Sequence, residues 1–226
     1  ADTNEELIAC YRGVQQNAEA VAARLLELHT DEDSYYRVRA QHPVEDIQRA
    51  VRLIYLNRTS FNGLWRVNRK GDYNVPYGHR QVDLEWLVDD ILAAGRALQN
   101  AELLCQDFKK TMSHRRAGSL VFCDPPYITG HTNNGFRQYN QKLFSWDDQM
   151  ELAKRATRAA SRGVHVVVSN AHHDALAELY GGLCASEHSR RCSLSGVSSG
   201  RGQVPEYLFA SAEINERLAL SSVVTS

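Results

Sequence analysis

The sequence lacks the paired cysteines, long apolar runs and charge imbalance that assign many proteins to a class at once. Its five cysteines are odd in number and form no CxxC pair, which indicates neither a zinc site nor a disulfide framework. No apolar run is long enough to cross a bilayer, and no signal-peptide pattern is recognisable. We therefore expect a cytoplasmic, globular protein with reduced thiols and no bound metal.

Basic and acidic residues are nearly balanced, at 26 against 27, so net charge alone favours neither nucleic acid nor membrane. The charge is unevenly distributed, however, because residues 49–80 hold seven basic residues and one acid. Such a cluster is typical of a polyanion-binding surface, but equally of an ordinary solvated face. The charge pattern leaves both interpretations open.

The stretch "SLVFCDPPYITG", residues 119–130, joins a strand-like run to a turn. Residues 120–123 are apolar without polar alternation, which predicts a short strand buried on both faces. Pro125 and Pro126 then end the strand, because each fixes φ and removes a backbone donor. We expect this turn to aim the carboxylate of Asp124 and the neighbouring carbonyl groups at a ligand.

Helical and strand-like segments alternate along the chain. A capping-box pattern at Thr3 predicts a helix that begins there and is interrupted at Gly13. The other predicted helices are 45–57, 83–100 and 147–162, and the predicted strands are 102–105, 120–123, 164–169 and 206–210. This order predicts an α/β core with a mainly parallel sheet, in which ligands bind at the carboxyl ends of the strands. Asp2, Asp107 and Asp124 fall at those ends.

Six segments together resemble the DNA adenine N6-methyltransferases of the Dam type, and the resemblance covers nearly the whole chain. The segments are "ADTNEELI", "YLNRTSFNGLWRVNRKGDYNVPYG", "CDPPY", "FSWDDQMELA", "VVVSN" and the tail "RRCSLSG…R…PEYL". The second segment and the Asp-Pro-Pro-Tyr turn are highly specific in combination.

The resemblance implies a Rossmann-like, S-adenosylmethionine-dependent methyltransferase core with a mainly parallel sheet, formed by residues 1–12 and 84–226. A mostly helical target-recognition domain, residues 13–83, is inserted into this core. The implied reaction transfers a methyl group from S-adenosylmethionine to the N6 amine of adenine in a short palindromic, GATC-like site of double-stranded DNA, by base flipping. We expect a monomer that acts on DNA and not at a membrane, in a bacterial nucleoid or a phage-infected cell.

The resemblance assigns catalysis to Asp124, Pro125, Pro126 and Tyr127. The exocyclic amine of adenine is a poor nucleophile because its lone pair is conjugated into the ring. Asp124 and the Pro125 carbonyl can each accept one N–H, which localises that lone pair and stabilises the positive charge developing on nitrogen. Tyr127 offers a flat face on which an extruded adenine can stack. This chemistry requires no metal.

The resemblance assigns cofactor binding to Asp2, Asp107, Phe108 and Asp124. Asp2 matches an acid that hydrogen-bonds the methionine moiety or the ribose, and helix capping is its alternative role. Asp107 and Phe108 match positions beside the adenine of the cofactor, although Gln106 also fits in a shifted register. Asp124 belongs to the region where the two substrates meet.

The DNA-binding residues implied by the resemblance lie mainly in the basic middle segment. Phe61 matches an aromatic residue that enters the gap left by the flipped base, and Arg66 matches an arginine that reads guanine N7 and O6. Phosphate binding, which positions the protein without specifying sequence, is the alternative role of Arg66. Phe136, Tyr139 and Phe144 fit either the base pocket or the core. The full implied set is Phe61, Asn62, Leu64, Arg66, Pro76, His79 and Tyr139.

One feature departs from the family pattern. The family begins with a strand and a Phe-x-Gly-x-Gly loop that wraps the cofactor, and neither precedes Asp2, so we expect a truncated chain with weak cofactor binding. A catalytically inactive DNA-binding fragment is therefore an alternative. Amino-methylation of cytosine N4 or of RNA is another, whereas the histidines of "NAHHDA" form a poor set of metal ligands.

Overall fold

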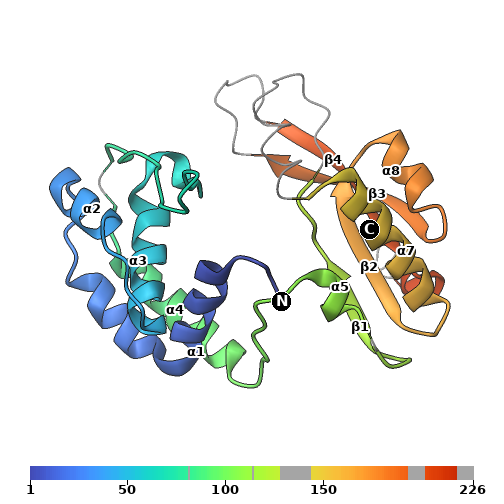
Figure 1. The fold of residues 1–226 in the computed structure, drawn as a ribbon, viewed down its shortest axis with the longest axis horizontal. Coiled ribbons are helices and arrows are strands. Elements are labelled where there is room, and N and C mark those ends of the chain that lie inside the picture. The colour runs from blue at the N-terminus through green and yellow to red at the C-terminus, as the bar shows by residue number, and fades with distance from the viewer. Residues whose placement is uncertain (81, 114, 128–143, 193–201, 218–226) are drawn as a thin grey trace, which may run out of the picture. The chain divides into compact units, whose positions relative to one another are not determined.

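The chain folds into two compact units, Ala1–Asp107 and Phe108–Ser226, in a computed structural model (Figure 1). The structure describes residues 1–80, 82–113, 115–127, 144–192 and 202–217. Among these residues, no helix is both long enough and apolar enough to cross a membrane.

The first unit is built from helices. Its elements are α1 (Glu5–Leu26), α2 (Glu32–Arg39), α3 (Asp46–Thr59), η1 (Phe61–Gly63), η2 (Glu85–Leu87) and α4 (Val88–Leu98). α1 packs against both α3 and α4. Gly13 permits the approach of α1 to α3, because a Cβ at this position would lie only 2.4 Å from the Asp46 carbonyl oxygen.

Two predictions about α1 are wrong. Gly13 does not interrupt the helix, and the non-helical backbone lies at Asn17 instead, with φ of −161°. The helix is capped by Asn4 rather than Thr3, since the Asn4 side chain accepts a hydrogen bond from the Leu7 N–H over 3.2 Å. A close helix crossing explains the glycine better than a break does, and the sequence alone does not reveal such a crossing.

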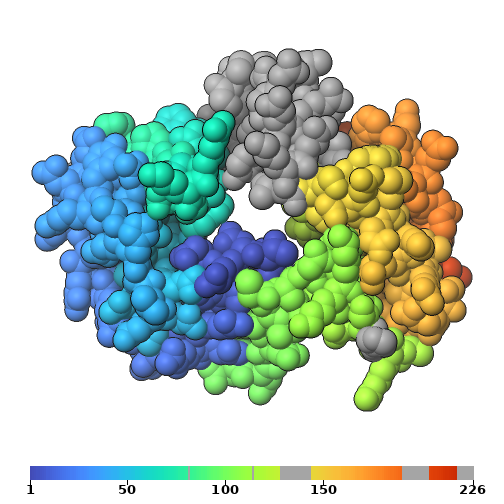
Figure 2. All heavy atoms as spheres, viewed as in Figure 1, coloured from blue at the N-terminus to red at the C-terminus, as the bar shows by residue number. Residues whose placement is uncertain are grey.

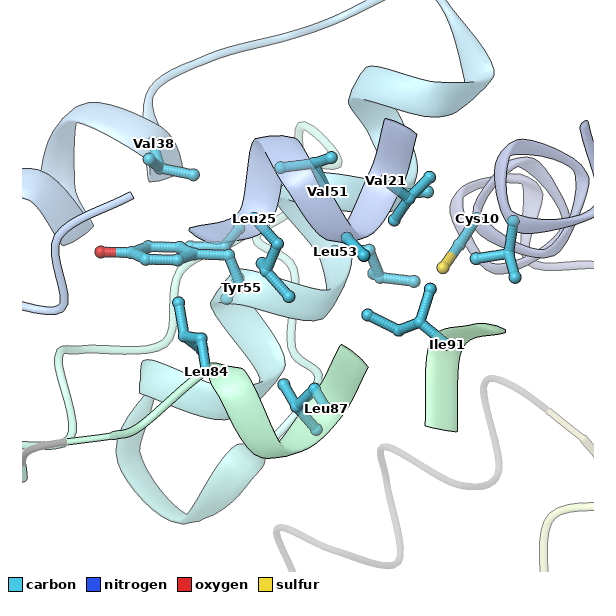
Figure 3. Packing of buried hydrophobic residues seen from close by; sticks show 14 of the residues in the cluster. Cys10, Val21, Leu25, Val38, Val51, Leu53, Tyr55, Leu84, Leu87 and Ile91 are labelled. Carbon is cyan, nitrogen blue, oxygen red and sulfur yellow. The ribbon is translucent and has the colours of Figure 1, made fainter. Parts of the chain in front are cut away.

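The apolar faces of the helices in the first unit meet in one buried cluster (Figure 3). Leu25 from α1 and Tyr55 from α3 are fully buried there, and Ile91 from α4 belongs to the same cluster. A buried phenol needs a hydrogen-bond partner, and the Tyr55 hydroxyl donates to the His29 carbonyl oxygen over 2.7 Å. Burial raises the pKa of Tyr55 to about 12, so this hydroxyl stays protonated.

Residues 59–78 form an antiparallel ribbon on the first unit, which we call the 59–78 hairpin. Isolated antiparallel bridges join Ser60 to Tyr77 and Val67 to Tyr73. The Tyr73 hydroxyl donates to the Leu64 carbonyl oxygen over 2.7 Å, and the buried Tyr35 hydroxyl of α2 donates to the Val75 carbonyl oxygen over 2.8 Å. These bonds tie the hairpin to itself and to the helices beneath it.

The second unit combines a sheet with helices. Its elements are α5 (Phe108–Thr111), β1 (Leu120–Cys123), α7 (Trp146–Ala160), β2 (His165–Ala171), α8 (Asp174–Leu179), β3 (Cys184–Cys192) and β4 (Gly202–Ala210). α7 packs against β2 through its buried residues, which include Leu152 and Ala156, while its opposite side lies at the surface (Figure 2).

The four strands have the order β1-β2-β4-β3. β1 pairs with β2 in parallel, whereas β4 pairs antiparallel with both of its neighbours. Three strands therefore run in one direction and β4 runs against them. The sequence predicted a mainly parallel sheet, but only one of the three pairings in the described sheet is parallel, because the last strand inserts between β2 and β3.

Two of the predicted strands differ from the structure. Residues 102–105 form no strand and contribute only a single parallel bridge, between Asp2 and Cys105. β1 is a strand as predicted but is not buried on both faces, since Leu120 and Phe122 are 63% and 62% exposed. β1 is an edge strand of the described sheet. Only its alternate residues Val121 and Cys123 face the apolar cluster under α7.

The two compact units do not follow the predicted domain boundaries. The boundary after residue 12 falls inside α1. The one after residue 83 falls between Val82, which packs against the buried cluster of the first unit, and Leu84, which is part of that cluster. The division of the chain into compact units does not show which residues contact DNA or cofactor. The division into a methyltransferase core, residues 1–12 and 84–226, and a target-recognition part, residues 13–83, therefore stays a prediction about function.

Candidate active site

Asp124 lies directly beyond the carboxyl end of β1. The parallel pairing of β1 with β2 aligns Cys123 with Val168, so the next residues, Asp124 and Ser169, are neighbours across the two strands. The Ser169 hydroxyl donates to Asp124 Oδ1 over 2.6 Å. Asp124 is exposed, whereas Ser169 is buried. The carboxylate is therefore accessible to a ligand, while the hydrogen bond from Ser169 restrains its orientation.

The two prolines that follow β1 differ in burial. Pro125 is buried, Pro126 is exposed, and Tyr127 is half-buried. Burial of Pro125 anchors the turn, and the absence of backbone donors at both prolines prevents the chain from continuing the ladder. The preceding thiol is inert, since burial raises the pKa of Cys123 to about 11.

A buried polar group supports the end of β2 behind Ser169. Asn170 Nδ2 donates to Gln149 Oε1 over 3.1 Å, and the Tyr180 hydroxyl donates to the same oxygen over 3.0 Å. All three side chains are fully buried, and burial raises the pKa of Tyr180. This group links α7, β2 and the end of α8.

Phe108 and Phe144 are in contact in the second unit. Their ring centroids lie 5.4 Å apart, and both rings pack against the edge of the apolar cluster. The family resemblance assigned Phe108 to the cofactor and left Phe144 between base pocket and core. Next to them, Lys109 Nζ pairs with Asp148 Oδ1 at 3.0 Å.

The structure brings two of the predicted cofactor segments side by side in the first unit. The Asp2 N–H donates to the Leu104 carbonyl oxygen over 3.1 Å, and the Gln106 N–H donates to the Asp2 carbonyl oxygen over 3.0 Å. Asp107 follows directly, and both carboxylates are exposed. Asp2 Oδ1 accepts the Asn4 N–H over 2.7 Å, so this aspartate orders the turn before α1 without being its N-cap.

The predicted DNA-binding residues of the first unit gather on the 59–78 hairpin and just after it. Phe61 and Leu64 are large apolar side chains that are 50% and 41% exposed. Pro76 is exposed, and its carbonyl oxygen accepts the Phe61 N–H over 2.9 Å. Asn62 has a φ of 54°, a left-handed conformation that asparagine tolerates better than most residues.

Arg66 is held in a fixed orientation on the hairpin. Its Nε donates to Asn74 Oδ1 over 2.8 Å, and one terminal nitrogen donates to the Asn74 carbonyl oxygen over 3.1 Å. The side chain is exposed. His79, also exposed, has a φ of 49° and meets the ring of Tyr77 edge-on at 5.2 Å.

Two predicted residues, Phe136 and Tyr139, lie outside the described residues. Sequence reasoning assigned no role to Ser169 or to Asn74. In the structure Ser169 contacts Asp124, and Asn74 contacts Arg66. Ser169 lies in the quoted segment "VVVSN", but its contact follows only from the strand register. Within the described ranges, no group of three histidine, cysteine, aspartate or glutamate side chains could hold a metal ion.

The chain belongs to the D12 class of N6 adenine-specific DNA methyltransferases, because the model of that family matches residues 1–191. It is thus an adenine-specific DNA methyltransferase of the Dam type. The family's substrate, adenine in DNA, argues against the cytosine and RNA alternatives.

Relatives of the chain include type II methyltransferases and a DNA adenine methylase of a retron. The chain is 31% identical to the type II methyltransferase M.MjaIII of Methanocaldococcus jannaschii over 198 residues. The aligned region covers 81% of this chain and 68% of the relative. The chain is 33% identical to the type II methyltransferase M1.LlaDCHI of Lactococcus lactis, with 92% and 76% covered. The retron Ec67 DNA adenine methylase of Escherichia coli is 31% identical, with 90% and 71% covered.

Proposed function

We propose that this methyltransferase transfers the methyl group of S-adenosylmethionine to the N6 amine of an adenine flipped out of a GATC-like site in double-stranded DNA. The position of Asp124 supports this proposal most strongly. It is an exposed carboxylate at a strand end, followed by Pro125 and Tyr127 and hydrogen bonded from behind by Ser169. That is the arrangement that activation of a conjugated amine requires.

Asp124 and the Pro125 carbonyl accept the two N–H groups of the adenine amine, which pyramidalises the nitrogen and localises its lone pair. S-adenosylmethionine supplies an electrophilic methyl group when it is bound. As the carbon–nitrogen bond forms and the carbon–sulfur bond breaks, Asp124 stabilises the positive charge on N6. The nitrogen then loses one proton to solvent water, which leaves neutral methylated adenine and a neutral thioether as the products. Tyr127 stacks on the extruded base during these events.

Asp2 and Asp107 fit the cofactor chemically. Both are exposed acceptors close to the backbone bridge between Asp2 and Cys105, and ribose hydroxyls and an adenine amine are donors that such carboxylates accept. Phe108 supplies an aromatic face to the adenine of the cofactor. We extend this assignment to a Rossmann-like core, of which the described sheet is one part.

The 59–78 hairpin is the proposed DNA-reading element. Its exposed Phe61 fills the gap left by the flipped base, while Leu64 and Pro76 contact thymine methyl groups. Arg66, held by Asn74, presents its remaining N–H groups to the N7 and O6 of a guanine. We further propose that the enzyme acts as a monomer on the DNA of the nucleoid or of a phage-infected cell.

Methyl transfer from tritiated S-adenosylmethionine tests this proposal. The substrates are a GATC duplex, the same duplex with N6-methyladenine in both strands, and a GTAC duplex of equal composition. We expect label only in the unmethylated GATC duplex. Equal label in the GATC and GTAC duplexes would contradict the proposed site. DNA binding without label in any duplex would favour the inactive DNA-binding alternative.

A further inference from the structure

The contact between Ser169 and Asp124 joins a buried hydroxyl to an exposed carboxylate. A serine hydroxyl carries one hydrogen, and two acceptors lie within reach of Ser169 Oγ: Asp124 Oδ1 at 2.6 Å and the Cys123 carbonyl oxygen at 3.4 Å. The difference of distance places that hydrogen on the carboxylate. Ser169 is only 6% exposed, so water competes poorly for this bond.

This bond fixes the direction of the carboxylate. Without a partner, an exposed aspartate at a strand end rotates about its Cα–Cβ and Cβ–Cγ bonds, and few of its orientations suit one reacting nitrogen. With Oδ1 occupied by a short, charge-assisted bond, Oδ2 is left to accept the substrate N–H in one defined direction. Small errors in such geometry reduce rates strongly even where binding is preserved.

We propose that Ser169 is a positioning residue for methyl transfer, which acts by holding the carboxylate of Asp124 in the orientation that accepts the adenine amine. This inference rests on the proposed catalytic role of Asp124. Ser169 touches neither the reacting atoms nor the cofactor in this scheme. Its effect therefore belongs to the chemical step and not to the binding of DNA or cofactor.

The surroundings of Ser169 keep its hydroxyl in place. The next residue, Asn170, is fully buried and bonded to Gln149, which also accepts the hydroxyl of Tyr180. The backbone at the end of β2 is thus tied to the helices packed on the sheet. A serine on a mobile loop would not fix a carboxylate, whereas one on this strand end does.

Ser211, which directly follows β4, provides a matched control that is bonded to the same strand, β2. Its buried hydroxyl oxygen accepts the Val166 N–H over 3.2 Å, at the end of β2 remote from Asp124. Ser211→Ala and Ser169→Ala each remove one buried hydroxyl bonded at β2, so both lower stability. Only Ser169→Ala removes a bond to Asp124.

The test compares single-turnover methyl transfer at saturating DNA and S-adenosylmethionine for wild type, Ser169→Ala, Ser169→Thr and Ser211→Ala. We expect Ser169→Ala to lower this rate at least tenfold, while the Kd values for DNA and cofactor change less than twofold. Ser169→Thr, which keeps the hydroxyl, should stay within threefold of wild type. Ser211→Ala should lower the unfolding temperature without slowing the step.

Three outcomes would overturn the inference: a Ser169→Ala rate within twofold of wild type, a Ser169→Thr variant as slow as Ser169→Ala, or an equal loss of rate in Ser211→Ala. These results are read against a wild-type enzyme that methylates DNA. A wild-type protein without methyl transfer would instead overturn the proposed function itself, and the inference with it. The two failures are therefore distinguishable.

Discussion

The backbone N–H of Phe61 donates to the carbonyl oxygen of Pro76 over 2.9 Å, which joins two proposed DNA-contacting residues that are far apart in sequence. The bond belongs to the 59–78 hairpin, whose bridges and buried tyrosine hydroxyls fix its shape. A DNA-binding hairpin that is already ordered loses little conformational entropy when it binds. The exposed side chains of Phe61 and Pro76 are thus presented together before DNA arrives.

Arg66→Ala should lower affinity for the cognate duplex by about 1–3 kcal/mol and flatten discrimination at one base pair. Arg69, an exposed arginine in the turn of the same hairpin, is the matched control. We expect Arg69→Ala to weaken cognate and non-cognate duplexes alike. The measurement is a titration against all single-base variants of the site. Uniform weakening by Arg66→Ala would assign this residue to phosphate instead.

Asn74→Ala should weaken cognate binding by about 0.5–1.5 kcal/mol, because Arg66 loses the side-chain acceptor that orients it. The same substitution in an Arg66→Ala background should have almost no further effect. A double-mutant cycle on the cognate duplex measures this coupling. Additive losses would mean that Asn74 acts independently of Arg66.

Cys105 offers a probe of the proposed cofactor site. Its thiol is exposed beside Asp2, whereas burial raises the pKa of Cys10 to about 12 and that of Cys123 to about 11. Alkylation at pH 8, followed peptide by peptide with mass spectrometry, should modify Cys105 far faster than these two. Saturating S-adenosylmethionine should slow it several-fold. An unchanged Cys105 rate in saturating cofactor would count against the assignment of Asp2.

α7 begins with a capping box, in which the Ser145 hydroxyl oxygen accepts the Asp148 N–H over 3.1 Å and Asp148 Oδ2 accepts the Ser145 N–H over 3.1 Å. This capping box should make stability depend on pH. Hydrogen bonds from Lys109 and Ser145 lower the pKa of Asp148 from its ordinary value of 3.8. A lowered pKa means that ionised Asp148 stabilises the fold above pH 3.8, and that this contribution is lost as pH falls through the lower, folded-state pKa. Asp148→Ala should therefore reduce the free energy of unfolding by about 1 kcal/mol at pH 7.

Denaturant titrations at pH 7 and at several values below 3.8 measure this effect. The deficit of Asp148→Ala should shrink across the acidic series. Asp147→Ala, at an exposed neighbouring position of the same helical turn, should stay within about 0.5 kcal/mol of wild type throughout. A deficit that is constant with pH would contradict the role of the ionised carboxylate.

Long periodic segments were predictable from sequence, and the polar edge strand β3 was not. The predicted helices at 45–57 and 147–162 correspond to Asp46–Thr59 and Trp146–Ala160, because their buried residues recur at helical spacing. β3 escaped prediction because it is a polar strand at one end of the described sheet. Its stability comes from pairing with β4, which no local pattern encodes.

Only those residues of the candidate site that a local sequence pattern marks were predictable. Asp124 stood out because a carboxylate and two prolines end an apolar run. Ser169 and Asn74 did not, since their importance depends on strand register and hairpin pairing, which are long-range properties. The exposure of Phe61 and Leu64 likewise follows from the hairpin and not from composition.

Single-turnover methyl transfer by Asp124→Ala, measured beside DNA binding, tests the central claim most directly. We expect the variant to bind the GATC duplex with nearly wild-type affinity, because the proposed reading residues lie on the 59–78 hairpin. Its rate should fall well beyond tenfold, since a factor of ten is only about 1.4 kcal/mol and the carboxylate should contribute several times that. A variant that keeps more than a tenth of the wild-type rate would contradict the account.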